Sequence, residues 1–245
     1  MPRRRRRSEA RRDANPAERP PPAPVSAPTR WPAATLLVVA VAVVYLPALR
    51  AGFVGWDDPL YVSRNACVTR ADGPLISWTR NCGPEQYGAP PAWTENNPGY
   101  YPITLATFWV EWRAAAKAPW LFHVDNVALH AANALLVWRL AGELGMPAPF
   151  GWFVAAVWAL HPVQVESVAW ITERKNTLYV FFYLLALLLF VRARNATGHL
   201  LALGALALSL LSKATAMTLP AVLVPLAWAR GTALRDRRLW GWVAA

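Results

Sequence analysis

The 245-residue sequence contains little charge. Charged residues make up 16% of it and hydrophobic residues 56%, whereas a soluble domain carries about 25% charged residues. This balance, together with long apolar runs, excludes an ordinary soluble domain and predicts an all-α, polytopic membrane helical bundle. The fourteen tryptophans agree with this class, because indole rings favour the membrane–water interface.

Compact motifs of soluble enzymes are also missing. The sequence has no zinc-ligand spacing, no nucleophile elbow and no glycine-rich phosphate loop, so no soluble-enzyme class is supported. Cysteine is scarce as well, because Cys67 and Cys82 are the only two. Both fall in one predicted outer loop. A disulfide there would contribute roughly 3 kcal/mol in an oxidising compartment, and two unpaired thiols are the alternative.

The net charge of +11 is unevenly distributed. Nine arginines stand among residues 1–30 against three acidic residues, and prolines follow the arginines. Such a segment cannot bury a core, so we expect a disordered cytoplasmic tail that flanks the first span and contacts anionic lipid head groups. No nucleic-acid-binding fold accompanies the charge, so nucleic acid is not an expected partner.

Residues 31–245 are predicted to form one transmembrane domain. Six apolar runs alternate across a membrane, with short connections after the second of them, and a seventh begins at Trp240 and stops at Ala245, so we expect a longer parent chain. The six are Trp31–Leu49, Trp120–Leu140, Phe150–Leu160, Tyr179–Val191, Leu200–Leu211 and Met217–Ala229.

Arginine placement predicts the orientation. With the N-terminus inside, Arg192, Arg194 and the arginines after Ala229 are also inside, as the positive-inside rule requires. The long loop 50–118 and the polar clusters then lie outside. Within this loop, Tyr101–Arg113 has the pattern of a helix lying in the membrane interface. We expect a bacterial inner-membrane protein with its active face outside.

Adjacent carboxylates follow the first span. Asp57 and Asp58 stand beside Trp56 and before Pro59, so ordinary turn chemistry is one explanation. Two neighbouring carboxylates also repel, which allows one to act as a general base. Together they could instead hold a divalent cation, Mg²⁺ or Mn²⁺.

Three cations stand at later outer boundaries. Arg174, Lys175 and Lys213 are suited to bind a lipid phosphate, and snorkelling at the interface is the alternative. Glu173 is expected to pair with a neighbouring cation. His161 and Glu166 are predicted to orient substrate or to pair with Arg174, although His161-Pro162 also has the form of a helix terminator.

The second predicted span carries a polar stripe. His123, Asn126, His130 and Asn133 are spaced by three, four and three residues and therefore share one helix face. Hydrogen bonds between helices and a wet functional cavity explain such a stripe equally well.

Several segments carry a family resemblance. Phe53-Val-Gly-Trp-Asp-Asp-Pro-Leu-Tyr61, His123-Val-Asp-Asn-Val-Ala-Leu-His130 and Ala159-Leu-His-Pro-Val-Gln-Val-Glu166, which runs on to Asn176, occur in this order. The sequence Leu211-Ser-Lys-Ala-Thr-Ala-Met-Thr-Leu-Pro220 follows. Together these segments resemble the polytopic GT-C glycosyltransferases. Among them, the chain is most similar to the transmembrane and tetratricopeptide-repeat O-mannosyltransferase-like proteins and their bacterial relatives.

The resemblance implies a GT-C-like fold and transfer of a sugar from a polyprenyl-phosphate donor to an acceptor hydroxyl, possibly of a protein Ser or Thr, on the outer face. It implies a catalytic role for Asp57 or Asp58 and donor-phosphate contacts by Arg174, Lys175 and Lys213. The polar clusters described above add His130, His161, Glu166 and Glu173 as supporting residues. A non-catalytic membrane scaffold, or a module that moves a lipid-linked substrate, is the alternative.

Overall fold

The computed structural model describes residues 31–79, 82, 100–115 and 118–229. The chain from Ala33 onward forms one compact unit, and the fold described below is that of this unit. The described residues are helical or lie in turns, with no strand among them. The all-α prediction is therefore confirmed for this part of the chain, whereas the predicted disordered tail (1–30) and the start of a seventh span lie outside the described residues.

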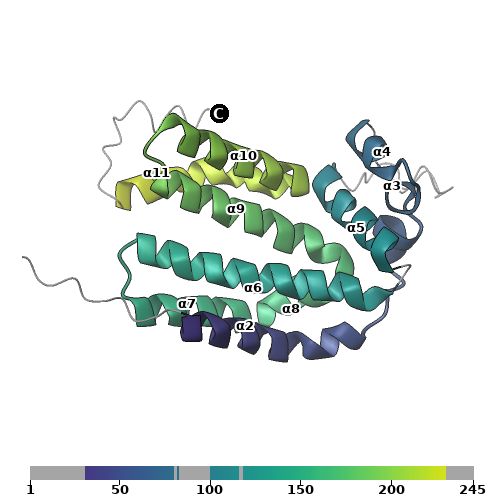
Figure 1. The fold of residues 1–245 in the computed structure, drawn as a ribbon, viewed down its shortest axis with the longest axis horizontal. Helices are drawn as coiled ribbons and strands as arrows, with labels where there is room; N and C mark the ends of the chain where they lie inside the picture. Colours follow the sequence, from purple (N-terminus) through teal and green to yellow (C-terminus); the bar gives the residue numbers. More distant parts are fainter. Residues whose placement is uncertain (1–30, 80–81, 83–99, 116–117, 230–245) are drawn as a thin grey trace, which may run out of the picture. The chain divides into compact units, whose positions relative to one another are not determined.

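Long helices lie side by side and alternate in direction (Figure 1). They are α2 (Trp31–Tyr45), which continues as the 3₁₀ turn η2 (Leu46–Arg50), α6 (Pro119–Glu143), α7 (Ala148–Leu160), α9 (Arg174–Arg192), α10 (Ala196–Ser212) and α11 (Leu219–Ala229). Gly145, with φ +82°, ends the first turn after α6 in a backbone conformation that glycine adopts freely.

Two apolar cores hold the bundle together. Leu37 and Val41 of α2 pack against Trp138 of α6 and the small residues Ala155 and Ala159 of α7. Small side chains let helix backbones approach closely, which suits packing within a membrane. The other core joins α9, α10 and α11 through leucines and alanines that are buried between them.

Shorter helices gather at one end of the bundle (Figure 1). Before α6 these are the π-helical turn η3 (Pro59–Ser63), α3 (Ala66–Thr69), α4 (Gly73–Thr79) and α5 (Pro102–Ala115). After α7 come η6 (Pro162–Gln164), α8 (Val165–Ala169) and η7 (Ile171–Glu173), and η8 (Ala214–Thr218) precedes α11. We call this end, where 51–79, 100–115, 161–175 and 213–218 lie, the outer end.

The outer end has its own apolar core. Phe108 of α5 and Phe122 of α6 are fully buried in it beside the Cys67–Cys82 disulfide, so the structure pairs the two cysteines. Asn65 begins α3, because its side chain accepts a hydrogen bond from the Cys67 amide at 2.9 Å and donates one to the Leu60 carbonyl at 2.9 Å. At Gly73 a Cβ atom would lie 2.3 Å from the Cys67 carbonyl oxygen, so only glycine fits there.

The predicted interfacial helix forms, but its apolar face packs on protein and not on lipid. Its residues form α5, and Leu105 and Phe108 are buried in the outer core rather than exposed to lipid. The indole of Trp109 donates a hydrogen bond to the Arg70 carbonyl at 2.8 Å. This amphipathic face therefore packs on protein, because α3, α4 and α6 cover it.

The six-span prediction is only partly matched by helix length. Two helical segments, Trp31–Arg50 and Ile171–Arg192, are long and apolar enough to cross a membrane. The 25-residue α6 is long enough, but its His and Asn stripe makes it more polar. The 13 residues of α7 extend about 20 Å, short of a hydrocarbon core of about 30 Å. The predicted third span is therefore too short to cross alone as a straight helix.

Candidate functional site

Asp58 is a buried anchor rather than a free carboxylate. It has no exposed surface, and its Oδ2 accepts a hydrogen bond from the Val54 amide at 2.6 Å. Its Oδ1 accepts hydrogen bonds from the Trp170 indole at 3.1 Å and from the Thr172 hydroxyl and amide at 2.8 and 3.3 Å. Four donors on two chain segments thus satisfy this carboxylate, which joins the first outer loop to η7.

Asp57 differs from its neighbour. Its side chain is half-buried and makes no hydrogen bond within the described part of the chain, while its backbone carbonyl accepts from the Leu60 and Tyr61 amides that open η3. Its charge raises the pKa of the Tyr61 phenol, although burial of that ring has the larger effect. Next to it, the exposed Trp56 packs on Trp170 at 6.1 Å between ring centroids. Asp57 is therefore the carboxylate of the pair that can reach a substrate.

Arg174 is buried and fully engaged. Its guanidinium donates hydrogen bonds to Glu111, to the Asn126 side chain at 2.7 Å and to the Phe122 carbonyl at 2.6 Å. The ring of Phe108 lies 4.7 Å from it, and none of its surface is exposed. A phosphate cannot reach this guanidinium in the observed arrangement, so the donor-phosphate role expected for Arg174 has no geometric support.

Glu111 is the buried partner that the sequence prediction missed. The prediction placed it on an interfacial helix and offered Glu166 as the partner of Arg174, and that pairing is wrong. Burial raises the pKa of Glu111 to about 7, against the opposing effect of Arg174. The sequence contained a signal for this burial, because Glu111 follows Phe108 by three residues and Thr104 by seven. The three residues therefore share the face of α5 that is buried.

Lys175 and Glu173 form the predicted neighbouring pair. Lys175 Nζ lies 2.7 Å from Glu173 Oε1 and 5.0 Å from the centre of the Tyr61 ring. The other Glu173 oxygen accepts a hydrogen bond from the Asn176 amide at 2.5 Å. Both charged side chains keep a small exposed fraction, 13% and 12%, so Lys175 remains open to solvent at the outer end.

Lys213 reaches the same cluster from the end of α10. Its ammonium donates to Asn176 Oδ1 at 2.5 Å and lies 5.9 Å from the centre of the Tyr179 ring. Burial lowers the pKa of this ammonium, while the Glu173 carboxylate acts in the opposite direction. Asn176 thus links Lys213 to the Lys175–Glu173 pair, because it accepts from Lys213 and donates to Glu173.

The remaining candidates serve mainly local roles. His161 is exposed, and its Nδ1 accepts a hydrogen bond from the Val163 amide at 3.2 Å, as a residue that begins a new turn does. Glu166 is exposed in the first turn of α8. Neither lies in the cation cluster, so their predicted supporting roles gain no contact in the described structure.

The polar stripe of α6 is buried along its length. Asn126 donates to the Trp170 carbonyl at 3.1 Å, and His130 Nε2 lies 2.8 Å from the Ala159 carbonyl oxygen. Asn133 donates to the Thr177 carbonyl at 2.8 Å, whereas neither ring nitrogen of His123 has a partner among the residues described. These contacts show the helix-joining role, and two members of the stripe also line a cavity.

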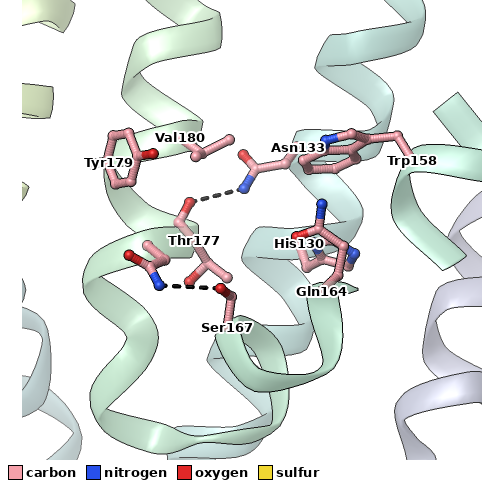
Figure 2. Close-up of a pocket in the computed structure, with 9 residues that line it drawn as sticks. His130, Asn133, Trp158, Gln164, Ser167, Thr177, Tyr179 and Val180 are labelled. Atoms are coloured by element: carbon pink, nitrogen blue, oxygen red, sulfur yellow. Dashed lines mark hydrogen bonds between the residues drawn. The ribbon is translucent and has the colours of Figure 1, made fainter. Parts of the chain in front are cut away.

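That cavity, of about 350 Å³, is partly open and is lined by residues of α6, α7, α8, α9 and η6 (Figure 2). His130 and Asn133 form one side of it, Trp158 another, and Gln164 and Ser167 lie toward the outer end. The residues of α9 that line it include Asn176 and Tyr179, which are the two that contact Lys213. The cavity therefore adjoins the cation cluster.

A shared metal ion does not fit the Asp57–Asp58 pair. A cation would have to displace the donors that already occupy both oxygens of Asp58, leaving Asp57 as the free ligand. Within the described residues, no three His, Cys, Asp or Glu side chains gather as a metal site requires. Metal dependence remains a prediction that a chelator can test.

Several curated proteins that are similar to this chain are named protein O-mannosyl-transferases. The chain is 34% identical over 180 residues to Protein O-mannosyl-transferase Tmtc1 of Drosophila melanogaster, covering 72% of this chain and 20% of that protein. It is 29% identical over 190 residues to Protein O-mannosyl-transferase F38B6.6 of Caenorhabditis elegans, covering 76% and 26%. The chain is related to protein O-mannosyl-transferases.

A further relative, Protein O-mannosyl-transferase Tmtc2 of Drosophila melanogaster, is 31% identical over 186 residues, covering 72% of this chain and 19% of that protein. The chain thus spans about a fifth to a quarter of the length of these relatives. No family model and no solved structure matches it. The relationship to O-mannosyltransferase-like proteins is confirmed, while the GT-C class and the bacterial relatives remain predictions.

Proposed function

We propose that the protein to which this chain belongs transfers a sugar from a polyprenyl-phosphate donor to an acceptor hydroxyl on the outer face of a membrane. The names of the relatives indicate a mannosyl group and a protein acceptor. The observation that carries the proposal is the cluster at the outer end. In this cluster Lys213 contacts Asn176, Lys175 pairs with Glu173 beside Tyr61, and the polar cavity adjoins them. The Asp57 carboxylate, which has no hydrogen bond from the described residues, lies close enough to affect the pKa of Tyr61.

A division of roles follows from these positions. The Asp57 carboxylate accepts the proton of the acceptor hydroxyl as its oxygen attacks the anomeric carbon. The bond between that carbon and the phosphate oxygen breaks, and the lipid phosphate leaves with the electron pair. Lys213 and Lys175 stabilise its negative charge. Asp58 and Arg174 act indirectly, because they position the loop that carries Asp57 and the start of α9.

The membrane setting rests on exposed apolar faces. Leu36, Val39 and Val43 of α2 are exposed, as are Phe150 and Phe153 of α7. Soluble monomers rarely expose apolar surface in such continuous stripes. Together with the two helices long enough to cross a bilayer, these faces support an integral membrane protein whose outer end meets the lipid head groups.

The proposal can be tested with purified full-length parent protein in lipid nanodiscs. It should transfer radiolabelled mannose from polyprenyl-phosphate mannose to an acceptor peptide rich in Ser and Thr, and it should not use a nucleotide-linked mannose. Lys213→Gln should raise the donor KM about tenfold, because one charged contact to phosphate is lost. A Lys213→Gln enzyme with unchanged donor KM would remove this residue from the donor site.

A scaffold or transport module remains the second candidate. Asp58 and Arg174, two residues expected to act on substrate, are instead buried in structural contacts. A protein that binds polyprenyl phosphate through Lys213 and transfers nothing from any donor would favour this candidate. The chelator arm of the same assay tests whether transfer requires Mg²⁺ or Mn²⁺.

A further inference from the structure

None of the described residues that line the cavity between α6, α7 and α9 carries a full charge. Three amide side chains line it, those of Asn133, Gln164 and Asn176, and Ser167 and Tyr179 add hydroxyl groups. Trp158 supplies an aromatic surface on the α7 side (Figure 2). At about 350 Å³ the cavity is at the small end of the range for ligand pockets.

This lining has the chemistry that recognises a neutral, polyhydroxylated ring. Amides and hydroxyls donate to and accept from ligand hydroxyl groups, and an aromatic surface packs against the apolar face of the ring. A phosphate or carboxylate would find no cation among the described residues of the lining. An acyl chain would leave the buried Oδ1 of Asn133 without a donor, which is costly.

Asn133 provides the most specific observation. Only 1% of its surface is exposed, and its amide nitrogen is held by the Thr177 carbonyl at 2.8 Å (Figure 2). Its Oδ1 has no hydrogen-bond partner among the described residues. Buried side-chain acceptors are rarely left unpaired, so this oxygen marks a point at the cavity wall where a ligand hydroxyl would supply the missing donor.

One side of the cavity adjoins the cation Lys213. Asn176 and Tyr179 line it and contact Lys213, and Ser167 accepts a hydrogen bond from Asn176 at 3.1 Å. A ring in the cavity would therefore present one edge to the ammonium of Lys213. A glycosyl phosphate matches this polarity, with its ring among the amides and its phosphate at the cation.

We infer that this cavity is the pyranose subsite, in which Asn133 and Ser167 bind sugar hydroxyls, while Asn176, whose amide already contacts Ser167, Glu173 and Lys213, holds Ser167 in place. The assignment of the sugar to the lipid donor rests on the proposed function. The pyranose chemistry itself does not, because a free glycoside or an acceptor glycan would present the same ring.

The test compares two lipids on the full-length protein in nanodiscs. Binding of polyprenyl phosphate and of polyprenyl-phosphate mannose is measured for the wild type, Asn133→Leu and Ser167→Ala. Ser209→Ala is the matched control, because it removes a buried hydroxyl that donates to the Tyr179 carbonyl at 2.8 Å but does not line the cavity. Each variant must retain a monodisperse elution profile.

We expect the wild type to bind the mannosyl lipid more tightly than the bare lipid phosphate. Asn133→Leu and Ser167→Ala should reduce this preference about tenfold each while leaving the affinity for the bare lipid unchanged. Lys213→Gln should weaken both lipids and keep their ratio. If the well-folded Asn133→Leu and Ser167→Ala proteins keep the full preference for the mannosyl lipid, the inference is overturned.

Methyl α-mannoside distinguishes the sources of the ring. If it competes with the mannosyl lipid, the subsite holds the donor sugar. If it binds without competing, and Asn133→Leu abolishes that binding, the subsite holds an acceptor or free sugar. A preference for the mannosyl lipid in a protein that transfers nothing would contradict the proposed function alone. If the wild type transfers mannose and the Asn133→Leu and Ser167→Ala proteins keep the preference for the mannosyl lipid, this inference alone is contradicted.

Discussion

Neighbouring residues of the same type take different roles in this protein. Asp57 and Asp58 are adjacent carboxylates, yet Asp58 accepts from four donors and Asp57 accepts from none within the described part of the chain. Arg174 and Lys175 are adjacent cations, of which the first is fully buried and the second stays partly open. In each pair, the side chain that faces the outer core is structural and its neighbour remains available to a ligand.

Asp58→Asn should destabilise the outer end. An amide in this position accepts through one oxygen only, and its NH₂ group would face donors, so the loss should be on the order of 2–3 kcal/mol. Thermal unfolding in detergent measures this loss of stability. Asp57→Asn is the control, because it removes the same charge from a side chain that is not buried under donors. A melting temperature for Asp58→Asn equal to that of Asp57→Asn would contradict the anchor role.

At the scale of elements, one ion pair joins the outer helices to the bundle. Glu111 of α5 and Arg174 at the start of α9 meet in a buried contact beside Phe108 and Phe122. Thr104 adds a hydrogen bond from α5 to the Ser212 carbonyl at 3.0 Å. Arg174 also donates to the Thr107 hydroxyl of α5 at 3.5 Å, so polar links to α9 and α10 hold α5 within an apolar contact.

This docking should weaken as the pH rises. Burial raises the pKa of Glu111 from its usual 4.5 to about 7, so the folded state holds more protons than the unfolded state between these values. The contribution of the Glu111 carboxyl group to the free energy of unfolding is therefore greatest below pH 4.5. It falls between pH 4.5 and 7, by at most about 3 kcal/mol, as the buried group loses its proton. Hydrogen exchange of the α5 amides at pH 5 and pH 8 measures the change.

Glu111→Gln serves as the control for that pH dependence. A glutamine cannot titrate, so the difference in α5 protection between pH 5 and pH 8 should be smaller than in the wild type. An equal difference in both proteins would show that another group is responsible.

For the whole molecule, the alternating helices place all charged candidates at one end. The opposite end carries the turn around Gly145 and the ion pair between Arg192 and Glu143, whose Nε–Oε1 distance is 2.8 Å. Orientation in the membrane then decides which compartment the cation cluster faces. The arginine distribution predicts that it faces outside.

Two exposed methionines offer a matched test of this orientation. Met217 lies at the outer end and Met146 in the turn after α6, and both are exposed. With the native cysteines paired, Met217→Cys should react with a membrane-impermeant maleimide from outside the cell, and Met146→Cys only after the membrane is opened. Labelling of Met146→Cys in intact cells would reverse the topology.

Helix positions were largely readable from the sequence, because apolar runs and arginines define them. The predicted run Phe150–Leu160 lies within α7 (Ala148–Leu160), and Tyr179–Val191 lies within α9 (Arg174–Arg192). Contacts between distant segments were not readable. The pairing of Arg174 with Glu111, 63 residues apart in sequence, and the anchoring of Asp58 by Thr172, 114 residues away, depend on tertiary packing. The spacing of charges therefore found the outer cluster but not which members were buried.

The most direct measurement is transfer of mannose from polyprenyl-phosphate mannose by the full-length parent carrying Asp57→Asn. We expect this variant to melt at the wild-type temperature, to bind the donor with wild-type affinity and to lose at least about a hundredfold in kcat, because the acceptor hydroxyl has no base. Asp57→Asn protein with wild-type kcat would contradict the assignment of Asp57 as the catalytic base.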